Sequence, residues 1–102
     1  MSNAKHTPGP WRVSLSDDTV VIDAHGREVA MIDGDYNRPD EWPIMEANTR
    51  LIAAAPDLLA TLERLLHLDD SYGPFGGEIY QDRIDRAWEK ARAALAKAKG
   101  AA

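Results

Sequence analysis

The sequence contains no cysteine, a single phenylalanine and no long apolar run. The absence of cysteine excludes disulfide bonds, thiolate zinc sites and thiol nucleophiles. The longest apolar run, residues 51–56, is far shorter than the roughly 20 residues that a membrane-spanning helix needs. The first ten residues also lack the apolar stretch of a secretory signal. We therefore expect a cytoplasmic protein that does not associate with membranes.

What remains is typical of a small globular protein. The chain has 102 residues, of which 44% are apolar and 28% charged, and this length allows one domain covering residues 1–102. A chain of this size buries only roughly 60 to 68% of the surface that its unfolded form exposes. Its own core is therefore small, and we expect a homo-oligomer.

Charge is distributed unevenly along the chain. Residues 1–78 contain six Lys or Arg against 14 Asp or Glu, whereas residues 79–102 contain six against three. Nucleic-acid binding usually requires a dominant basic stripe, because phosphate contacts supply much of the affinity. The basic residues of the C-terminal part alternate with acidic ones and indicate a solvated helix face, so we expect no direct nucleic-acid contact. They are Arg83, Arg86, Lys90, Arg92, Lys97 and Lys99.

The N-terminal third has the pattern of a small sheet. Two prolines within residues 1–10 exclude a helix and indicate an extended arm. Apolar residues then alternate with polar ones, and Gly26 supplies the positive φ that a short hairpin loop requires. We predict a three-stranded antiparallel β-meander over residues 11–33.

Helices are predicted for the rest of the chain after a polar loop. Residues 43–68 carry apolar residues at helical spacing and form one helix kinked at Pro56, or two helices joined there. Residues 69–77 contain four breakers, three glycines and a proline, and predict a loop. A last helix over residues 78–99 completes an α+β fold with two or three helices. Its apolar stripe predicts core or a dimer seam, at Tyr80, Ile84, Trp88 and Leu95.

No group of residues has the pattern of a catalytic or metal site. The three histidines are far apart in the sequence and lack the spacing of zinc ligands. The run of oxygen donors at residues 33–37 resembles the first half of a calcium loop, but the glycine and glutamate that complete such a loop are missing. We expect no catalytic residue, no metal ion and no cofactor.

Asn48 is the one residue that departs from its local pattern. At about 100° per residue it falls between Ile44, Ile52 and Ala55 in an apolar stripe. A buried amide needs hydrogen-bond partners. Asn48 therefore either bonds to the sheet backbone or a loop, or faces a pocket. In the second case the nearby Trp42, Arg38 and Arg50 would offer a stacking face and two cations to a flat anionic ligand. Arg64, pointing away from its leucine stripe, would face a partner subunit's pocket or solvent.

Three segments resemble a widespread family of small phage and prophage proteins. They are residues 6–11 (HTPGPW), residues 21–30 (VIDAHGREVA) and residues 46–59 (EANTRLIAAAPDLL). The resemblance covers the first two thirds of the chain, and only Thr49 departs from the third segment, since the family often has alanine there. It implies a protein of the host bacterial cytoplasm.

The predicted arrangement, a small sheet followed by helices around Asn48, has a weaker resemblance to the Thoeris anti-defence sponges, which trap a cyclic ADP-ribose signal without cleaving it. It implies that Asn48 and Trp42 contact adenine or ribose. It also implies that Arg38, Arg50 or Arg64 contacts the pyrophosphate at a subunit interface. The predicted function is non-catalytic counter-defence by sequestration of a small anionic nucleotide. Two alternatives remain: an acidic inhibitor of a host immune complex, similar to acidic anti-CRISPR proteins, and a phage accessory protein without a ligand.

Overall fold

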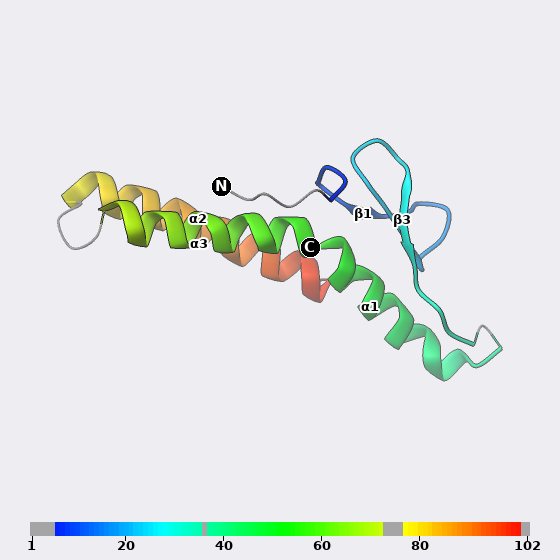
Figure 1. The fold of residues 1–102 in the computed structure, drawn as a ribbon. Helices are drawn as coiled ribbons and strands as arrows, with labels where there is room; N and C mark the ends of the chain where they lie inside the picture. Colours follow the sequence, from blue (N-terminus) through cyan, green and yellow to red (C-terminus); the bar gives the residue numbers. More distant parts are fainter. Residues whose placement is uncertain (1–5, 36, 73–76, 101–102) are drawn as a thin grey trace.

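The fold consists of a small sheet followed by three helices (Figure 1). A computed structural model describes residues 6–35, 37–72 and 77–100, and for residues 69–72 and 77–80 it describes the backbone alone. This architecture confirms the predicted α+β class. In chain order the elements are β1 (Arg12–Val13), β2 (Val20–Ile22), β3 (Glu28–Met31), the 3-10 turn η1 (Pro39–Glu41), α1 (Trp42–Ala53), α2 (Ala55–Tyr72) and α3 (Gly77–Lys99).

The sheet is an antiparallel meander in the order β1-β2-β3, as predicted. The central strand contributes the fully buried Val21, which pairs with Val13 on one side and Ala30 on the other. Burial of such a side chain stabilises the fold by about 1.5 to 3 kcal/mol. The β2–β3 hairpin turns at Gly26, whose φ of 80° confirms the expected left-handed conformation.

Helices α1 and α2 are separate, and only Ala54 lies between them. Proline has no N–H for a helical hydrogen bond and its ring clashes with the preceding turn, so the break falls just before Pro56, where it was predicted. The second helix runs on to Tyr72. Residues 69–72, predicted as loop, are therefore helical, because the breakers begin only at Gly73. Gly77, also predicted as loop, is the first residue of α3, and residues 73–76 lie outside the described residues.

Helix α3 packs along α2 and reaches α1 (Figure 1). From residue 81 onward its buried residues are Ala87 and Ala94, whose small side chains allow the helices to approach closely. Trp88 and Leu95, predicted as core or dimer seam, are 50% and 49% exposed and do not belong to the core of the chain. The side chain of Tyr80 lies outside the described residues.

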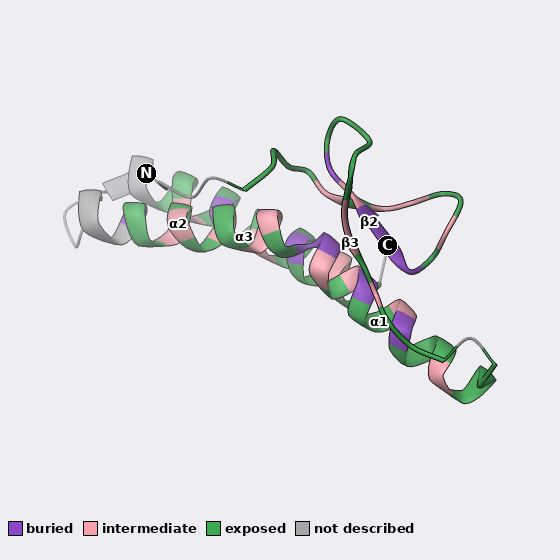
Figure 2. Cartoon of the chain, turned by 45° about the vertical axis from the view of Figure 1, so that its right-hand side comes forward, coloured by how far each residue is buried: buried purple, intermediate pink, exposed green. Residues whose placement is uncertain are grey.

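Helix α1 turns a different side toward the sheet than its sequence pattern predicts. Its buried residues are Met45, Thr49 and Ala53, spaced by four (Figure 2). Asn48 is exposed, so the prediction that it lies in the buried stripe is wrong. The helix has two apolar stripes about 100° apart, and the sheet covers the one with the smaller residues. Ile44, which belongs to the other stripe, is 61% exposed.

Candidate functional site

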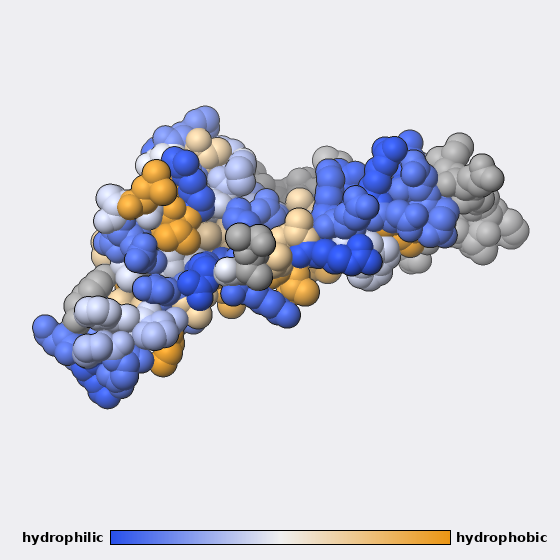
Figure 3. All heavy atoms as spheres, turned by 180° about the vertical axis from the view of Figure 1, so that it is seen from behind, coloured by the Kyte–Doolittle hydropathy of each residue, from blue (hydrophilic) through white to orange (hydrophobic). Residues whose placement is uncertain are grey.

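A groove with a surplus of positive charge runs between α2 and α3. It consists of two adjacent clefts of about 410 and 320 Å³, and the side chain of Arg64 lines both. Of the side chains that the structure describes along it, two are carboxylates, Asp57 and Asp82. Seen from behind, most of the helical hairpin surface is hydrophilic (Figure 3). The basic side chains that line the groove, which we call the cationic groove, are Arg64, Arg83, Arg86, Lys90 and Lys97, with His67 beside them.

Both carboxylates of the cationic groove are already paired. The ammonium group of Lys97 donates to Asp57 Oδ2 at 2.7 Å, and Arg86 lies 3.1 Å from Asp82. Among the residues that the structure describes, neither Arg64 nor Lys90 takes part in an ion pair. Among the side chains that the structure describes here, five basic groups line the groove against two carboxylates, an excess of three formal positive charges.

The five residues predicted to bind a ligand do not meet in one cleft of the described chain. Arg38 precedes η1 and pairs with Asp40 at 3.2 Å on the exposed surface. Trp42 begins α1, and Asn48 is exposed two turns further on. Arg64 is the one member of the predicted set that lies in the cationic groove.

Trp42 belongs to a second cleft, of about 270 Å³, between the sheet and α1. Three carboxylates line this cleft, on Asp17, Asp18 and Glu46. Hydrogen bonds from the hydroxyl and backbone N–H of Thr19 lower the pKa of Asp17, so its carboxylate stays charged. An anion at Trp42 would meet this negative charge, which disfavours the predicted stacking of a nucleotide there.

Arg50 packs at the opposite end of α1 against the end of α3. A Cβ at Gly100 would overlap the Arg50 side chain, and Gly100 has a φ of 77°. Within the described ranges, the Nε of Arg50 is buried without a hydrogen-bond partner. Arg50 is therefore a packing residue in this fold, and its Nε points away from the solvent.

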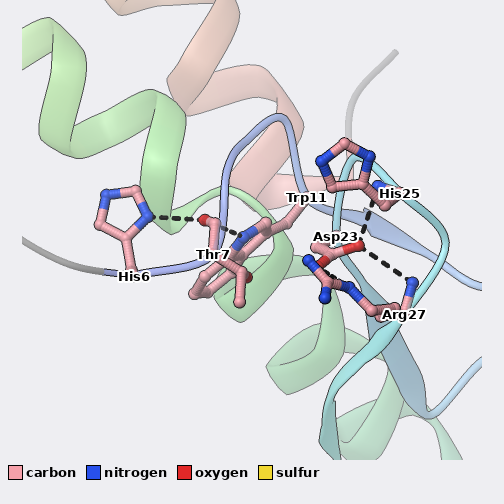
Figure 4. A network of polar contacts seen from close by, with 6 residues as sticks. All are labelled: His6, Thr7, Trp11, Asp23, His25 and Arg27. Carbon is pink, nitrogen blue, oxygen red and sulfur yellow. Dashed lines mark hydrogen bonds and ion pairs between the residues drawn. The ribbon is translucent and has the colours of Figure 1, made fainter.

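A polar network at the β2–β3 turn has a structural role (Figure 4). The buried carboxylate of Asp23 accepts hydrogen bonds from the backbone N–H groups of His25 and Arg27, at 2.8 and 3.0 Å. Burial works to raise the pKa of Asp23, but these hydrogen bonds and the Arg27 charge outweigh it and lower the pKa. Beside this turn, the indole of Trp11 donates to the carbonyl oxygen of Thr7.

The described side chains offer little for bond-making chemistry. No group of three or more His, Asp or Glu is placed to hold a metal ion among the residues searched. Among the described side chains of the cationic groove, the two carboxylates are paired with cations, and Thr61 carries the one hydroxyl group. Such an arrangement can attract and hold an anion. None of the helices in the described part of the chain is long and apolar enough to cross a membrane.

The cationic groove was missed because its residues are distributed over two helices. On α3, Arg83, Arg86, Lys90 and Lys97 are separated by three, four and seven residues, which places them on one side of the helix. This spacing was a usable signal, and the interpretation of these residues as a solvated face overlooked it. The contribution of Arg64 required knowledge of how α2 and α3 pack.

The fold and the groove define a small α+β protein that presents a basic cleft. The complete chain, residues 1–102, matches the family model of the Salmonella phage P22 protein Y8K6, and the chain belongs to this phage protein family. The match confirms the predicted membership of a small phage protein family and extends into the C-terminal third, which the resemblance had not covered. No match was found among curated proteins or among solved structures. The resemblance to anti-defence sponges stays a prediction.

Proposed function

We propose that this phage protein binds a small anionic, phosphate-bearing ligand in the cationic groove and holds it without chemical change. The observation that carries the proposal is the pair of cations, Arg64 and Lys90, that line one cleft without ion-pair partners among the described residues. Phosphate oxygens accept charge-assisted hydrogen bonds from such groups, and arginine binds them in a bidentate manner.

The dimensions of the groove favour a small ligand. Pockets for small molecules commonly measure about 300 to 1,000 Å³, and the two clefts of about 410 and 320 Å³ fall in that range. The described side chains that line them include no Trp, Tyr or Phe, and the contacts that these side chains offer are to phosphates. This fits the expected contact of Arg64 with a pyrophosphate. Asn48 and Trp42 do not line either cleft, so the proposed site does not include them.

A non-catalytic role is part of the proposal. A general base needs a carboxylate or imidazole free to take a proton. Asp57 and Asp82 are held by Lys97 and Arg86, and His67 is not free either. Sequestration of an immune nucleotide would serve counter-defence in the host cytoplasm, in agreement with the membership of a phage family.

The alternative of an acidic inhibitor rests on a different surface. Asp17, Asp18 and Glu46 surround the cleft between the sheet and α1 and could contact a basic channel of a host immune complex. Such a complex with a host protein should dissociate at high salt. A phage accessory protein without a ligand would bind neither an anion nor a host protein.

The test is retention of an intact ligand. Purified protein is incubated with ADP-ribose, cyclic ADP-ribose or a cyclic dinucleotide, freed of excess ligand and heated, and the supernatant is analysed by liquid chromatography. We expect one of these nucleotides to be recovered unchanged, and the double variant Arg64→Ala, Lys90→Ala to retain none. Lys99→Ala, an exposed cation outside the groove, is the matched control. Conversion of the nucleotide, or equal retention by the double variant, would contradict the proposal.

A further inference from the structure

Large apolar side chains lie exposed on one side of the α2–α3 hairpin. On α2 they form a row that contains Leu59, Leu62 and Leu66, separated by three and four residues and thus on one side of the helix. The row on α2 is about 10 Å long at 1.5 Å per residue. The exposed large apolar residues of the two helices, which we call the leucine face, are Leu59, Leu62, Leu66, Trp88 and Leu95.

The leucine face and the cationic groove lie on opposite sides of the α2–α3 hairpin. The half-buried Thr61 and Leu65 mark the side of α2 that faces α3. From their mean direction, Leu62 lies about 80° one way around the helix and Arg64 about 80° the other way, at 100° per residue. A partner that covers the leucine face therefore leaves the cationic groove open.

The chain exposes more surface than a compact monomer of its mass. Its accessible surface is 7454 Å², whereas the scaling of area with mass gives about 5,700 Å² for 11.3 kDa. The radius of gyration, 16.6 Å, also exceeds the value of about 13 Å expected for a compact domain of this length. The excess area of about 1,700 Å² is twice the roughly 800 Å² that each partner buries in a standard stable interface.

We propose that the leucine face is the contact surface for a second copy of this chain, which packs its own leucine face against it. The two hairpins would then form a four-helix bundle, in which Trp88 and the leucines of α2 become core. The interface would bury the large apolar side chains of the leucine face, which the single chain leaves exposed. This proposal goes beyond the ligand-binding function and does not depend on it.

Charges at the two edges of the leucine face support a second copy as the occupant. The ion pair between Asp57 and Lys97 fixes the register of α2 and α3. Glu63 lies six residues after Asp57, and Arg92 lies five residues before Lys97. Because α2 and α3 run in opposite directions, Glu63 and Arg92 lie at the same height along the hairpin to within one residue. Neither takes part in an ion pair within the described part of the chain.

These two charges also select the symmetry of the dimer. Glu63 lies next to the leucine face on the side of α2 that is turned away from α3. Arg92 lies next to it on the side of α3 that is turned away from α2, so the two residues lie on opposite edges of the face. A twofold axis along the hairpin places α2 of one copy over α3 of the other, and Glu63 of each copy then meets the partner's Arg92. A twofold axis across the hairpin would place like charges opposite each other, which is unfavourable.

The first test measures the mass of the full chain by light scattering coupled to size-exclusion chromatography. We expect a dimer of twice 11.3 kDa, and a monomer for Leu62→Glu, with unchanged helical circular dichroism. Leu62 is 60% exposed in the single chain, so the charge is tolerated in the monomer. The matched control Leu15→Glu, at a leucine that is 96% exposed and outside the face, should stay dimeric. A monomeric wild-type chain, or a dimeric Leu62→Glu variant, would overturn the proposal.

The second test exchanges the edge charges. Glu63→Arg and Arg92→Glu should each raise the dimer dissociation constant about tenfold or more, because like charges then meet across the interface. The double variant should recover most of the wild-type affinity in sedimentation equilibrium. Additive losses in the double variant would refute the twofold axis along the hairpin.

Discussion

The ammonium group of Lys97 lies 2.7 Å from Asp57 Oδ2 and also donates to the carbonyl oxygen of Trp11 at 2.7 Å. One side chain near the end of α3 thus connects the start of α2 with Trp11, the residue just before β1. The two contacts hold the sheet, α2 and α3 together at the point where α1 and α2 separate. They also fix which residues of α3 line the cationic groove.

Removal of this contact should destabilise the fold. We expect Lys97→Met, which keeps much of the aliphatic stem, to lower the free energy of unfolding by about 1 kcal/mol, since charged hydrogen bonds are lost at a partly exposed site. Lys99→Met should change it by less than about 0.5 kcal/mol. Chemical denaturation measures both. Equal effects of the two substitutions would show that the contact contributes nothing.

The reversed burial of Asn48 and Thr49 leads to a second prediction. Thr49 is fully buried, and its hydroxyl donates to the carbonyl oxygen of Met45 at 2.7 Å within the helix. Thr49→Asn should destabilise by about 2 kcal/mol or more, because the larger amide must fit against the sheet. Asn48→Ala should be almost neutral. Thermal unfolding of the two variants measures both effects. A large loss of stability in Asn48→Ala would indicate that Asn48 is buried, as expected from the sequence, and would contradict the structure.

Stability should fall in acid through the carboxylates with lowered pKa values. Asp17 and Asp23 each have a pKa below the ordinary value in the fold. Such groups stabilise the folded state above the unfolded pKa of about 3.9, and the contribution is lost as the pH falls through the folded pKa. We expect the free energy of unfolding to decrease below about pH 4. In Asp23→Asn that decrease should be smaller, and an unchanged pH profile would argue against the role of Asp23.

The hairpin turn offers a test of backbone strain alone. A Cβ at Gly26 would meet no atom within 4 Å, yet its φ is 80°. Gly26→Ala should therefore destabilise by about 1 kcal/mol through the left-handed backbone, whereas Gly26→Asn should cost less because asparagine tolerates that region. Denaturation midpoints of the two variants measure the difference. The same loss in both variants would point to a cause other than the backbone angle.

Local signals were enough to predict most of the fold. The alternation after Trp11, the glycine at position 26 and the proline at position 56 each constrain the backbone directly, and the sheet and helix break occur where they indicate. The candidate site depended on tertiary packing. Helix α1 has two apolar stripes, and only the position of the sheet decides that Thr49 is buried and Asn48 exposed. Similarly, Arg64 joins the cations of α3 only because α2 and α3 pack side by side.

The central claim is that the cationic groove binds phosphate-bearing anions through Arg64. The most direct measurement is a calorimetric titration with inorganic pyrophosphate at low and high salt, on the wild-type chain, Arg64→Ala and the control Lys99→Ala. The account predicts binding by the wild type and the control that weakens with salt, and a loss of about tenfold or more in affinity for Arg64→Ala. Equal affinity in all three proteins, or no binding at low salt, would contradict it.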